Sequence, residues 1–272
     1  MLRRSGMERW GRRTVVLVFG LWVGLLGMVW AEEVRPTVDL GTDVFSQYVW
    51  RGFALSDDSV VLQPSLTVSY RGAYVNFWGN FDTDRNNEHD KSLNGADWNE
   101  TDFTLGYTYE QFPYGLTLEV GSIYYALEGD DSLELYAGLS ATCPKTGIHF
   151  GFTVYREISH FPALWYELSL ARDFTFLRPE ITLNLSVSAM YLDSQDQGAY
   201  PDPDDPRDEF SDWLYLQLGA EISFPLGKYL TVTPKVYYSF SLSDDADHLL
   251  EEGSWDNHHD HFFGGLGLSF SF

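Results

Sequence analysis

The chain ends in the stretch Gly264-Gly-Leu-Gly-Leu-Ser-Phe-Ser-Phe272. In an extended strand, successive side chains point to opposite faces, so Leu266, Leu268, Phe270 and Phe272 share one face. The opposite face carries only glycine and serine. An apolar row opposite a row of small residues predicts a strand with one face in an apolar environment.

The position of this strand at the chain end narrows its interpretation. Chain ends of soluble domains are mostly polar and frayed, whereas the last residue here is Phe272. A closing strand with a terminal aromatic residue is typical of bacterial outer-membrane barrels, in which the barrel-assembly machinery reads that residue. A soluble sheet could use the same alternation, so the rest of the chain decides between them.

The N-terminus predicts export. Five arginines lie within residues 3–13, an apolar stretch covers residues 15–30, and Ala31 precedes two glutamates. This order is typical of a cleaved signal peptide. A membrane anchor is the alternative, but a spanning helix needs about 20 apolar residues and this stretch is shorter. We expect a signal peptide at residues 1–31 and one mature domain at residues 32–272.

Composition limits the function of the mature chain. Removal of residues 1–31 takes five arginines and one glutamate from 17 basic and 40 acidic residues, which moves the formal net charge from −23 to −27. Nucleic acid is excluded as a partner, because a polyanion needs a basic footprint. The aromatic content of 17% suits membrane interfaces. The single Cys143 cannot form an internal disulfide, and we expect no cofactor.

Segments of about ten residues with alternating side chains repeat along the mature chain. We find no later apolar segment long enough for a membrane helix, and no convincing helical period. A membrane location therefore requires a closed barrel, in which strands satisfy each other's backbone polar groups. We predict an all-β fold, a single antiparallel transmembrane barrel of about twelve strands. The expected strands are residues 36–53, 59–70, 73–83, 98–110, 115–128, 132–142, 147–158, 162–173, 177–193, 211–224, 229–243 and 260–272.

The connections between these strands alternate in character. One set is tight and rich in Gly and Pro, as at residues 70–73, 111–115 and 224–228. The other set includes long acidic loops at residues 84–97, 194–211 and 244–260. Short periplasmic turns and longer outer loops are the arrangement of outer-membrane barrels. Twelve strands, an even number, then place both termini in the periplasm. The barrel itself is expected to lie in an outer membrane of lipid and lipopolysaccharide.

The polar face of the strands carries charges that a dry interior would not accept without partners. We interpret this face as the lining of a water-filled lumen through which small solutes or ions diffuse. Carboxylates outnumber basic groups on it, which predicts a preference for cations. The candidate pore-lining residues are Asp39, Asp43, Arg51, Glu119, Glu134, Glu157, Glu167, Glu221 and Lys235, and the candidate assembly signal is Phe272.

The stretch Asp39–Phe53 resembles the opening of the TorF-type porin family of Gram-negative outer-membrane proteins. The family pattern Ser-x-Tyr-Val-Phe/Trp-Arg-Gly is matched by residues 46–52, and Gln63-Pro64 and Tyr74, Trp78 and Gly79 also fit. The resemblance covers roughly residues 38–83. It implies a barrel of unknown substrate and transfers no catalytic residue.

Arg51 has two interpretations. It lies near the end of the expected first strand, from which it could reach into the lumen and pair with a carboxylate such as Asp43. Alternatively it caps the strand end, with Gly52 forming a bulge. We favour a structural role.

Two further chemistries have candidate residues. The loop at residues 244–261 gathers four histidines among carboxylates, which could bind a divalent metal, but the spacing fits no standard site, and we expect a solvated loop and no metal. Ser159-His160 and Ser254 with His258 could supply a nucleophile and a base, but neither lies in a G-x-S-x-G elbow. We expect a channel and no enzyme. A non-transporting structural or adhesive barrel and a secreted carbohydrate-binding β-sandwich are the alternatives.

Overall fold

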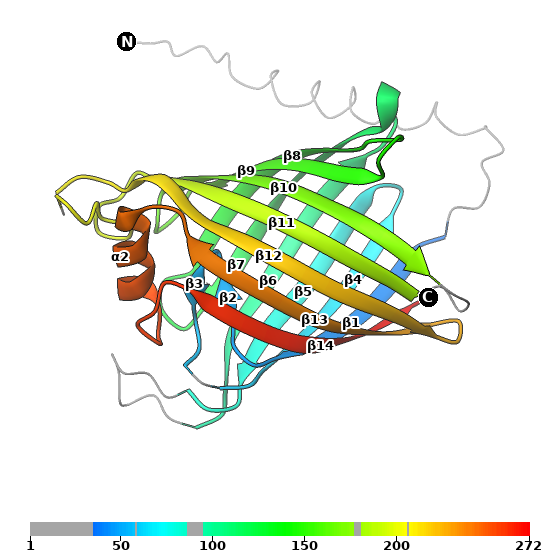
Figure 1. Ribbon diagram of the computed structural model, residues 1–272, viewed down its shortest axis with the longest axis horizontal. Helices are drawn as coiled ribbons and strands as arrows, with labels where there is room; N and C mark the ends of the chain where they lie inside the picture. The colour runs from blue at the N-terminus through cyan, green and yellow to red at the C-terminus, as the bar shows by residue number, and fades with distance from the viewer. Residues whose placement is uncertain (1–34, 58, 86–94, 177–180, 206) are drawn as a thin grey trace, which may run out of the picture. The chain divides into compact units, whose positions relative to one another are not determined.

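Twelve antiparallel strands close on themselves in the computed structural model, which describes residues 35–57, 59–85, 95–176, 181–205 and 207–272 (Figure 1). The predicted signal peptide lies outside the described residues. Consecutive strands are neighbours around the barrel, which confirms the predicted fold class and rules out a β-sandwich. The strands are β1 (Thr37–Phe45), β4 (Val61–Tyr70), β5 (Ala73–Asp82), β6 (Asp97–Tyr109), β7 (Leu116–Leu127), β8 (Ser132–Thr142), β9 (Ile148–Glu157), β10 (Ala163–Phe176), β11 (Ile181–Ser194), β12 (Ser211–Leu226), β13 (Leu230–Ser241) and β14 (His261–Ser271).

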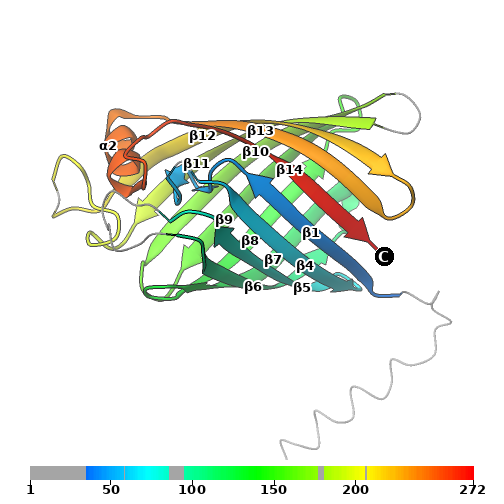
Figure 2. The same cartoon turned by 90° about the horizontal axis from the view of Figure 1, so that it is seen from below.

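The barrel closes where the first strand pairs with the last. β1 lies between β4 and β14 (Figure 2), and seven residue pairs, from Asp39–Ser271 to Phe45–Gly265, join it to β14. Beyond β14, Phe272 continues the pairing, because its N–H donates to the Val38 carbonyl at 3.0 Å. The C-terminal stretch is therefore the closing strand.

Alternation along the strands separates an apolar outside from a polar inside. Leu105 and Phe103 on β6 are 61% and 52% exposed, although they are among the most apolar side chains of the chain. Their neighbour Asp102 points inward beside Tyr125 of β7. Leu218 and Val236 are likewise exposed outside, whereas Lys235 contacts Asp43 inside.

The two ends of the barrel differ as expected. At one end, residues 71–72 and 227–229 join neighbouring strands through tight turns. Strand β1 begins at this end, and β14 ends there. A short 3-10 helix, η1 (Pro113–Gly115), forms part of another such turn. At the other end, the connections from β11 to β12 and from β13 to β14 are much longer (Figure 1). We call these the turn end and the loop end.

The first strand is shorter than predicted. β1 ends at Phe45, and the chain then forms an antiparallel hairpin of β2 (Val49–Trp50) and β3 (Phe53–Ala54), which pairs with neither β14 nor β4. We call residues 47–56 the inner hairpin. Its tip, Arg51-Gly52, has φ angles of 49° and 90°, as a two-residue type I′ turn requires. The Trp-Arg-Gly motif is thus a turn rather than a strand end.

A helix replaces the solvated loop predicted after β13. Helix α2 (Asp244–Gly253) begins at Ser243, whose hydroxyl accepts a hydrogen bond from the Ala246 N–H. Three aspartates lie in its first turn, where their negative charges interact favourably with the positive end of the helix dipole. Its buried residues are Ala246, Leu249 and Leu250. In the described part of the chain no helix is long and apolar enough to cross a membrane.

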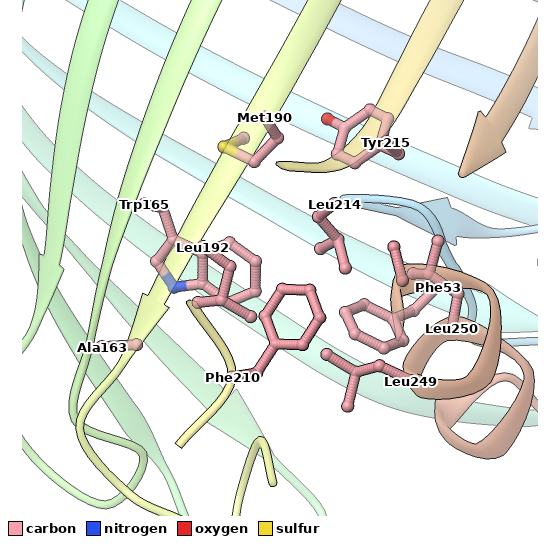
Figure 3. Close-up of a cluster of buried hydrophobic side chains, with 11 residues drawn as sticks. Phe53, Ala163, Trp165, Met190, Leu192, Phe210, Leu214, Tyr215, Leu249 and Leu250 are labelled. Atoms are coloured by element: carbon pink, nitrogen blue, oxygen red, sulfur yellow. The ribbon is translucent and has the colours of Figure 1, made fainter. Parts of the chain in front are cut away.

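A hydrophobic cluster fills part of the loop end. Leu249 and Leu250 of α2 pack with Phe53 of the inner hairpin and Phe210 of the β11–β12 loop (Figure 3). The barrel wall supplies Ala163, Trp165, Met190, Leu192, Leu214 and Tyr215. A bulge between Met190 and Tyr191 in the β11–β12 pairing turns both Leu214 and Tyr215 inward. The mouth is therefore narrowed by a packed core.

Candidate functional site: the barrel lumen

Arg51 fastens the inner hairpin to the barrel wall. Its guanidinium donates two hydrogen bonds to Glu134 of β8, at 2.6 and 2.8 Å. The same group lies 4.6 Å from the ring centroids of Trp50 and Tyr155 and 4.7 Å from that of Trp165. Such a bidentate pair within an aromatic cage uses the planar fork of arginine fully. Only 8% of the Arg51 side chain and 2% of the Glu134 side chain are exposed.

The prediction that Arg51 pairs with Asp43 is wrong. Asp43 instead pairs with Lys235 of β13, with 2.6 Å between Oδ1 and Nζ. This ion pair crosses over β14 at Gly267, where an added Cβ would lie 2.6 Å from Asp43 Oδ1 and 2.9 Å from Lys235 Cε. The row of small residues in the closing strand therefore makes room for charges that join β1 to β13.

A second contact set holds the inner hairpin to the segment after α2. The Ala54 N–H donates to the Ser254 hydroxyl at 3.0 Å, and the Trp255 N–H donates to the Ala54 carbonyl at 2.8 Å. Gln47 donates to Asp256 at 2.6 Å. Burial works to raise the pKa of Asp256, but hydrogen bonds from His261 and Gln47 outweigh it and hold this pKa below its usual range. The hairpin is thus fixed at its base as well as at its tip.

Ser254, His261 and Asp256 are arranged in the order of a hydrolase triad. Ser254 Oγ is 3.5 Å from His261 Nε2, and His261 Nδ1 is 3.3 Å from Asp256 Oδ2. Ser254 is fully buried, however, and its hydroxyl accepts the Ala54 N–H. The arrangement is therefore a structural clasp on the inner hairpin. The predicted pair of Ser254 with His258 does not form in these described residues, because the His258 ring faces its own loop at Asp256.

Glu157 is held entirely by protein donors. Its carboxylate accepts hydrogen bonds from the Ser132 and Ser159 hydroxyls and from the N–H groups of Ser159, His160 and Phe161. It thereby orders the short loop between β9 and β10. The Ser159 hydroxyl donates to Glu157 and the His160 ring contacts the Asp131 carbonyl, so these two side chains do not make a nucleophile–base pair.

The remaining predicted pore carboxylates pair with hydroxyl groups on other strands. Glu119 accepts hydrogen bonds from Tyr74 and Tyr136. In the same way Tyr155 donates to Glu167 and Tyr237 donates to Glu221. Asp39, near the turn end, accepts from Ser271. Sequence reasoning identified the carboxylates but missed the tyrosines, although Tyr74 and Tyr237 occupy the same alternating face.

An inner and an outer cavity lie within the described part of the barrel. The inner cavity, of about 380 Å³, is lined by polar and aromatic residues that include Tyr74, Glu119, Tyr136, Thr153 and Tyr155. The outer cavity, of about 390 Å³, lies between the inner hairpin, α2 and the β11–β12 loop. Its lining includes Trp50, Phe53, Glu100, Tyr125, Glu134, Glu157, Phe161, Trp165, Tyr200 and Glu252. Arg51 contacts the lining of both through Glu134 and Tyr155, so it marks the boundary between them.

The histidines of the last loop are dispersed. His248 faces the Asp244 carbonyl, His259 is 3.9 Å from Glu251, and His261 contacts Asp256. Throughout the described ranges, no group of three or more His, Cys, Asp or Glu side chains is placed to hold a metal ion.

Comparison with known proteins indicates the fold and leaves the activity open. The sequence profile of a family described as bacterial proteins of unknown function (Gcw_chp) matches residues 33–154. No curated protein matches.

Three solved structures resemble the barrel over nearly their whole length. The KdgM porin is 9% identical with a TM-score of 0.53, and covers 86% of this chain and 99% of its own. The NanC porin is 11% identical with a TM-score of 0.53, over 86% and 98% of the two chains. An outer-membrane channel from Pseudomonas putida F1 is 10% identical with a TM-score of 0.53, over 89% and 97%. At such identities the chain shares with these channels the fold of a closed barrel.

Proposed function

We propose that this chain is an outer-membrane channel for passive diffusion of small solutes or ions, narrowed at its outer mouth by the inner hairpin. The observation that carries the proposal is the polar inner cavity inside a closed barrel, whose lining residue Tyr155 contacts Arg51. A polar, hydrated passage through an apolar-faced barrel has the properties of a diffusion pore. The similar fold of the KdgM and NanC porins supports the same class of function.

The outer surface supports a location in lipid. Leu105, Phe103 and Leu218 are exposed on strands whose opposite face is polar. In water such a belt would be an aggregation hazard, whereas in a bilayer it is the lipid-facing band of a barrel. The turn end, where β1 begins and β14 ends, then faces the periplasm, and the loop end faces lipopolysaccharide. The predicted signal peptide and recognition by the barrel-assembly machinery fit this location and stay predictions, as does membership of the TorF-type family.

A preference for cations follows from the charges inside. Glu119, Glu167 and Glu221 accept hydrogen bonds from tyrosines and have no basic partner among the described contacts. Lys235 and Arg51 are each paired with one carboxylate, Asp43 and Glu134. The inner wall therefore keeps an excess of negative charge, and low-dielectric walls focus its field on passing ions.

Reversal potentials in a KCl gradient test both parts of this proposal. Refolded mature protein in a planar bilayer should pass current, with a reversal potential that indicates K⁺ preference at low salt. The preference should weaken near 1 M KCl, where the Debye length is about 3 Å. Anion preference at low salt would contradict the charge argument, and absence of conductance would contradict the channel.

A closed, non-transporting barrel is the second candidate. The hydrophobic cluster of Phe53, Phe210, Leu249 and Leu250 at the mouth favours it, because such a core leaves less room for solute. If wild-type protein is silent but a variant without the inner hairpin (residues 47–56 replaced by a short Gly-Ser linker) conducts, the barrel is a closed one.

A further inference from the structure

The outer cavity has walls that suit an organic cation. Its aromatic lining includes Trp50, Tyr125, Phe161, Trp165 and Tyr200. The faces of such rings carry partial negative charge and attract cations, while they also bury apolar groups. A volume of about 390 Å³ lies within the range of small-molecule sites.

The charge of the cavity points the same way. Its charged lining residues are the carboxylates of Glu100, Glu134, Glu157 and Glu252, and no lysine, arginine or histidine among the described residues lines it. Glu134 is neutralised by Arg51, and Glu157 is saturated by serine hydroxyls and backbone N–H groups. This leaves Glu100 as the buried lining carboxylate without a basic partner.

Glu100 lies in an environment that lacks positive charge. It is 6% exposed and lies close to the Tyr48 hydroxyl. Asp102 is two residues along the same face of β6, and its Oδ1 is buried without a hydrogen-bond partner. Two charged carboxylates on the same face of one strand, one buried and one half-buried, repel each other, and a positively charged group beside them would relieve that repulsion.

The neighbouring Arg51 cage supplies a precedent within the same wall. Trp50 and Trp165 line the outer cavity and also contact the guanidinium of Arg51, at 4.6 and 4.7 Å. The wall therefore already stabilises one planar cation on its inner side.

We propose that the outer cavity binds small organic monocations, with an ammonium, amidinium or guanidinium head at Glu100 and an apolar body between the aromatic rings. The inference deepens the proposed function, on which it rests, by naming the class of solute that meets the channel first. Aromatic contact favours a cation with an apolar body over a hydrated metal ion, whose water shell the rings cannot replace.

Calorimetric titration of the refolded mature chain with benzamidine and benzamide tests the proposal. The two probes have nearly the same shape, but benzamidine is a cation at pH 7 and benzamide is neutral. Benzamidine should bind with a dissociation constant at least about tenfold lower than that of benzamide. Glu100→Gln should weaken benzamidine binding by about tenfold. Glu251→Gln, on the outward side of α2 and absent from the cavity lining, should leave it unchanged.

A second variant covers the case in which Glu100→Gln fails to refold. Ala199 lines the cavity from the β11–β12 loop, outside the barrel wall, so Ala199→Trp should fill the space and abolish benzamidine binding. Equal binding of the two probes, or full binding by Ala199→Trp, would overturn the proposal. The titration needs no current through a bilayer, so a silent but binding barrel would contradict the channel alone, and a conducting barrel without binding would contradict this inference alone.

Discussion

Arg51 holds the inner hairpin in place through two kinds of contact, which are the bidentate ion pair with Glu134 and the aromatic rings around its guanidinium. Removing one partner of a buried ion pair leaves the other charge uncompensated, which costs about 3–5 kcal/mol. Arg51→Ala should therefore lower the free energy of unfolding by that amount in urea titrations of protein refolded into lipid vesicles. It should also raise conductance, because the tip of the inner hairpin is released.

The double variant Arg51→Ala/Glu134→Gln is the control for this prediction. Glutamine removes the unpaired charge, so the double variant should recover part of the lost stability while the larger conductance persists. If Arg51→Ala matched the wild type in both measurements, the pair would not be what holds the hairpin.

Opposite faces of one strand predict opposite tolerance of charge. Leu216 of β12 pairs with Phe240 on the outer face, and Gln217 pairs with Ser239 on the inner face. A charge at a mid-bilayer lipid-facing site costs about 2–4 kcal/mol. Leu216→Arg should therefore impair refolding into vesicles far more than Gln217→Arg, as followed by the shift of folded barrel on cold gels. Equal yields of the two variants would contradict the assigned faces.

At the scale of the element, small residues in β14 decide how the barrel closes. An added side chain at Gly267 would meet the Asp43–Lys235 ion pair within 3 Å. Gly267→Val should displace this pair and lower the free energy of unfolding by about 1–3 kcal/mol, the usual range for overpacking.

Gly129 offers the matched control for that substitution. A Cβ built there meets nothing within 4 Å, and its φ is not in the left-handed range. Gly129→Val should change unfolding by less than about 0.5 kcal/mol. Similar losses in both variants would mean that valine itself, rather than the closing contact, causes the effect.

The elements could be predicted from sequence to the extent that a local pattern defines them. Strands β4 to β13 follow from side-chain alternation and from Gly and Pro at the turns, because both signals lie within a few residues. Helix α2 was missed, since a ten-residue helix with three aspartates in its first turn and one apolar patch resembles an acidic loop. The inner hairpin was missed because Tyr48 and Trp50 continue the alternation of β1, and only distant partners turn them inward.

At the scale of the whole molecule, the terminal residue is expected to act in assembly rather than in stability. Phe272 is 62% exposed and stacks on Tyr229 at 5.4 Å between ring centroids. Deleting it removes these contacts and the last pairing with Val38. Immunoblots of fractionated cells should show less protein in the outer membrane and more in the periplasm, while the same variant refolds normally in detergent.

Tyr114 is a suitable control for this deletion. It lies in a turn at the same end of the barrel and is 97% exposed. Tyr114→Ala should reach the outer membrane at wild-type levels. Undiminished insertion of the protein without Phe272 would contradict its role as an assembly signal.

Some residues of the lumen could be predicted from the sequence, whereas others could not. Alternation places Glu119, Glu167, Glu221 and Lys235 on the polar face, and the register sets which strands they face. The partner of Arg51 lies 83 residues away in sequence, on a strand that is not adjacent to β1. No local sequence pattern encodes such a contact. The part that these lumen residues play in conduction stays a prediction.

The inner hairpin follows directly after the first strand, yet its partners come late in the chain. Arg51 contacts Glu134 and Trp165, and Ala54 contacts Ser254, which lies 200 residues further along the chain. The inner hairpin therefore reaches its final position only when β8, β10 and the segment after α2 are in place. A chain without its last strands could hold the tip of the inner hairpin at Glu134 but not its base at Ser254, so narrowing of the mouth is coupled to closure of the barrel.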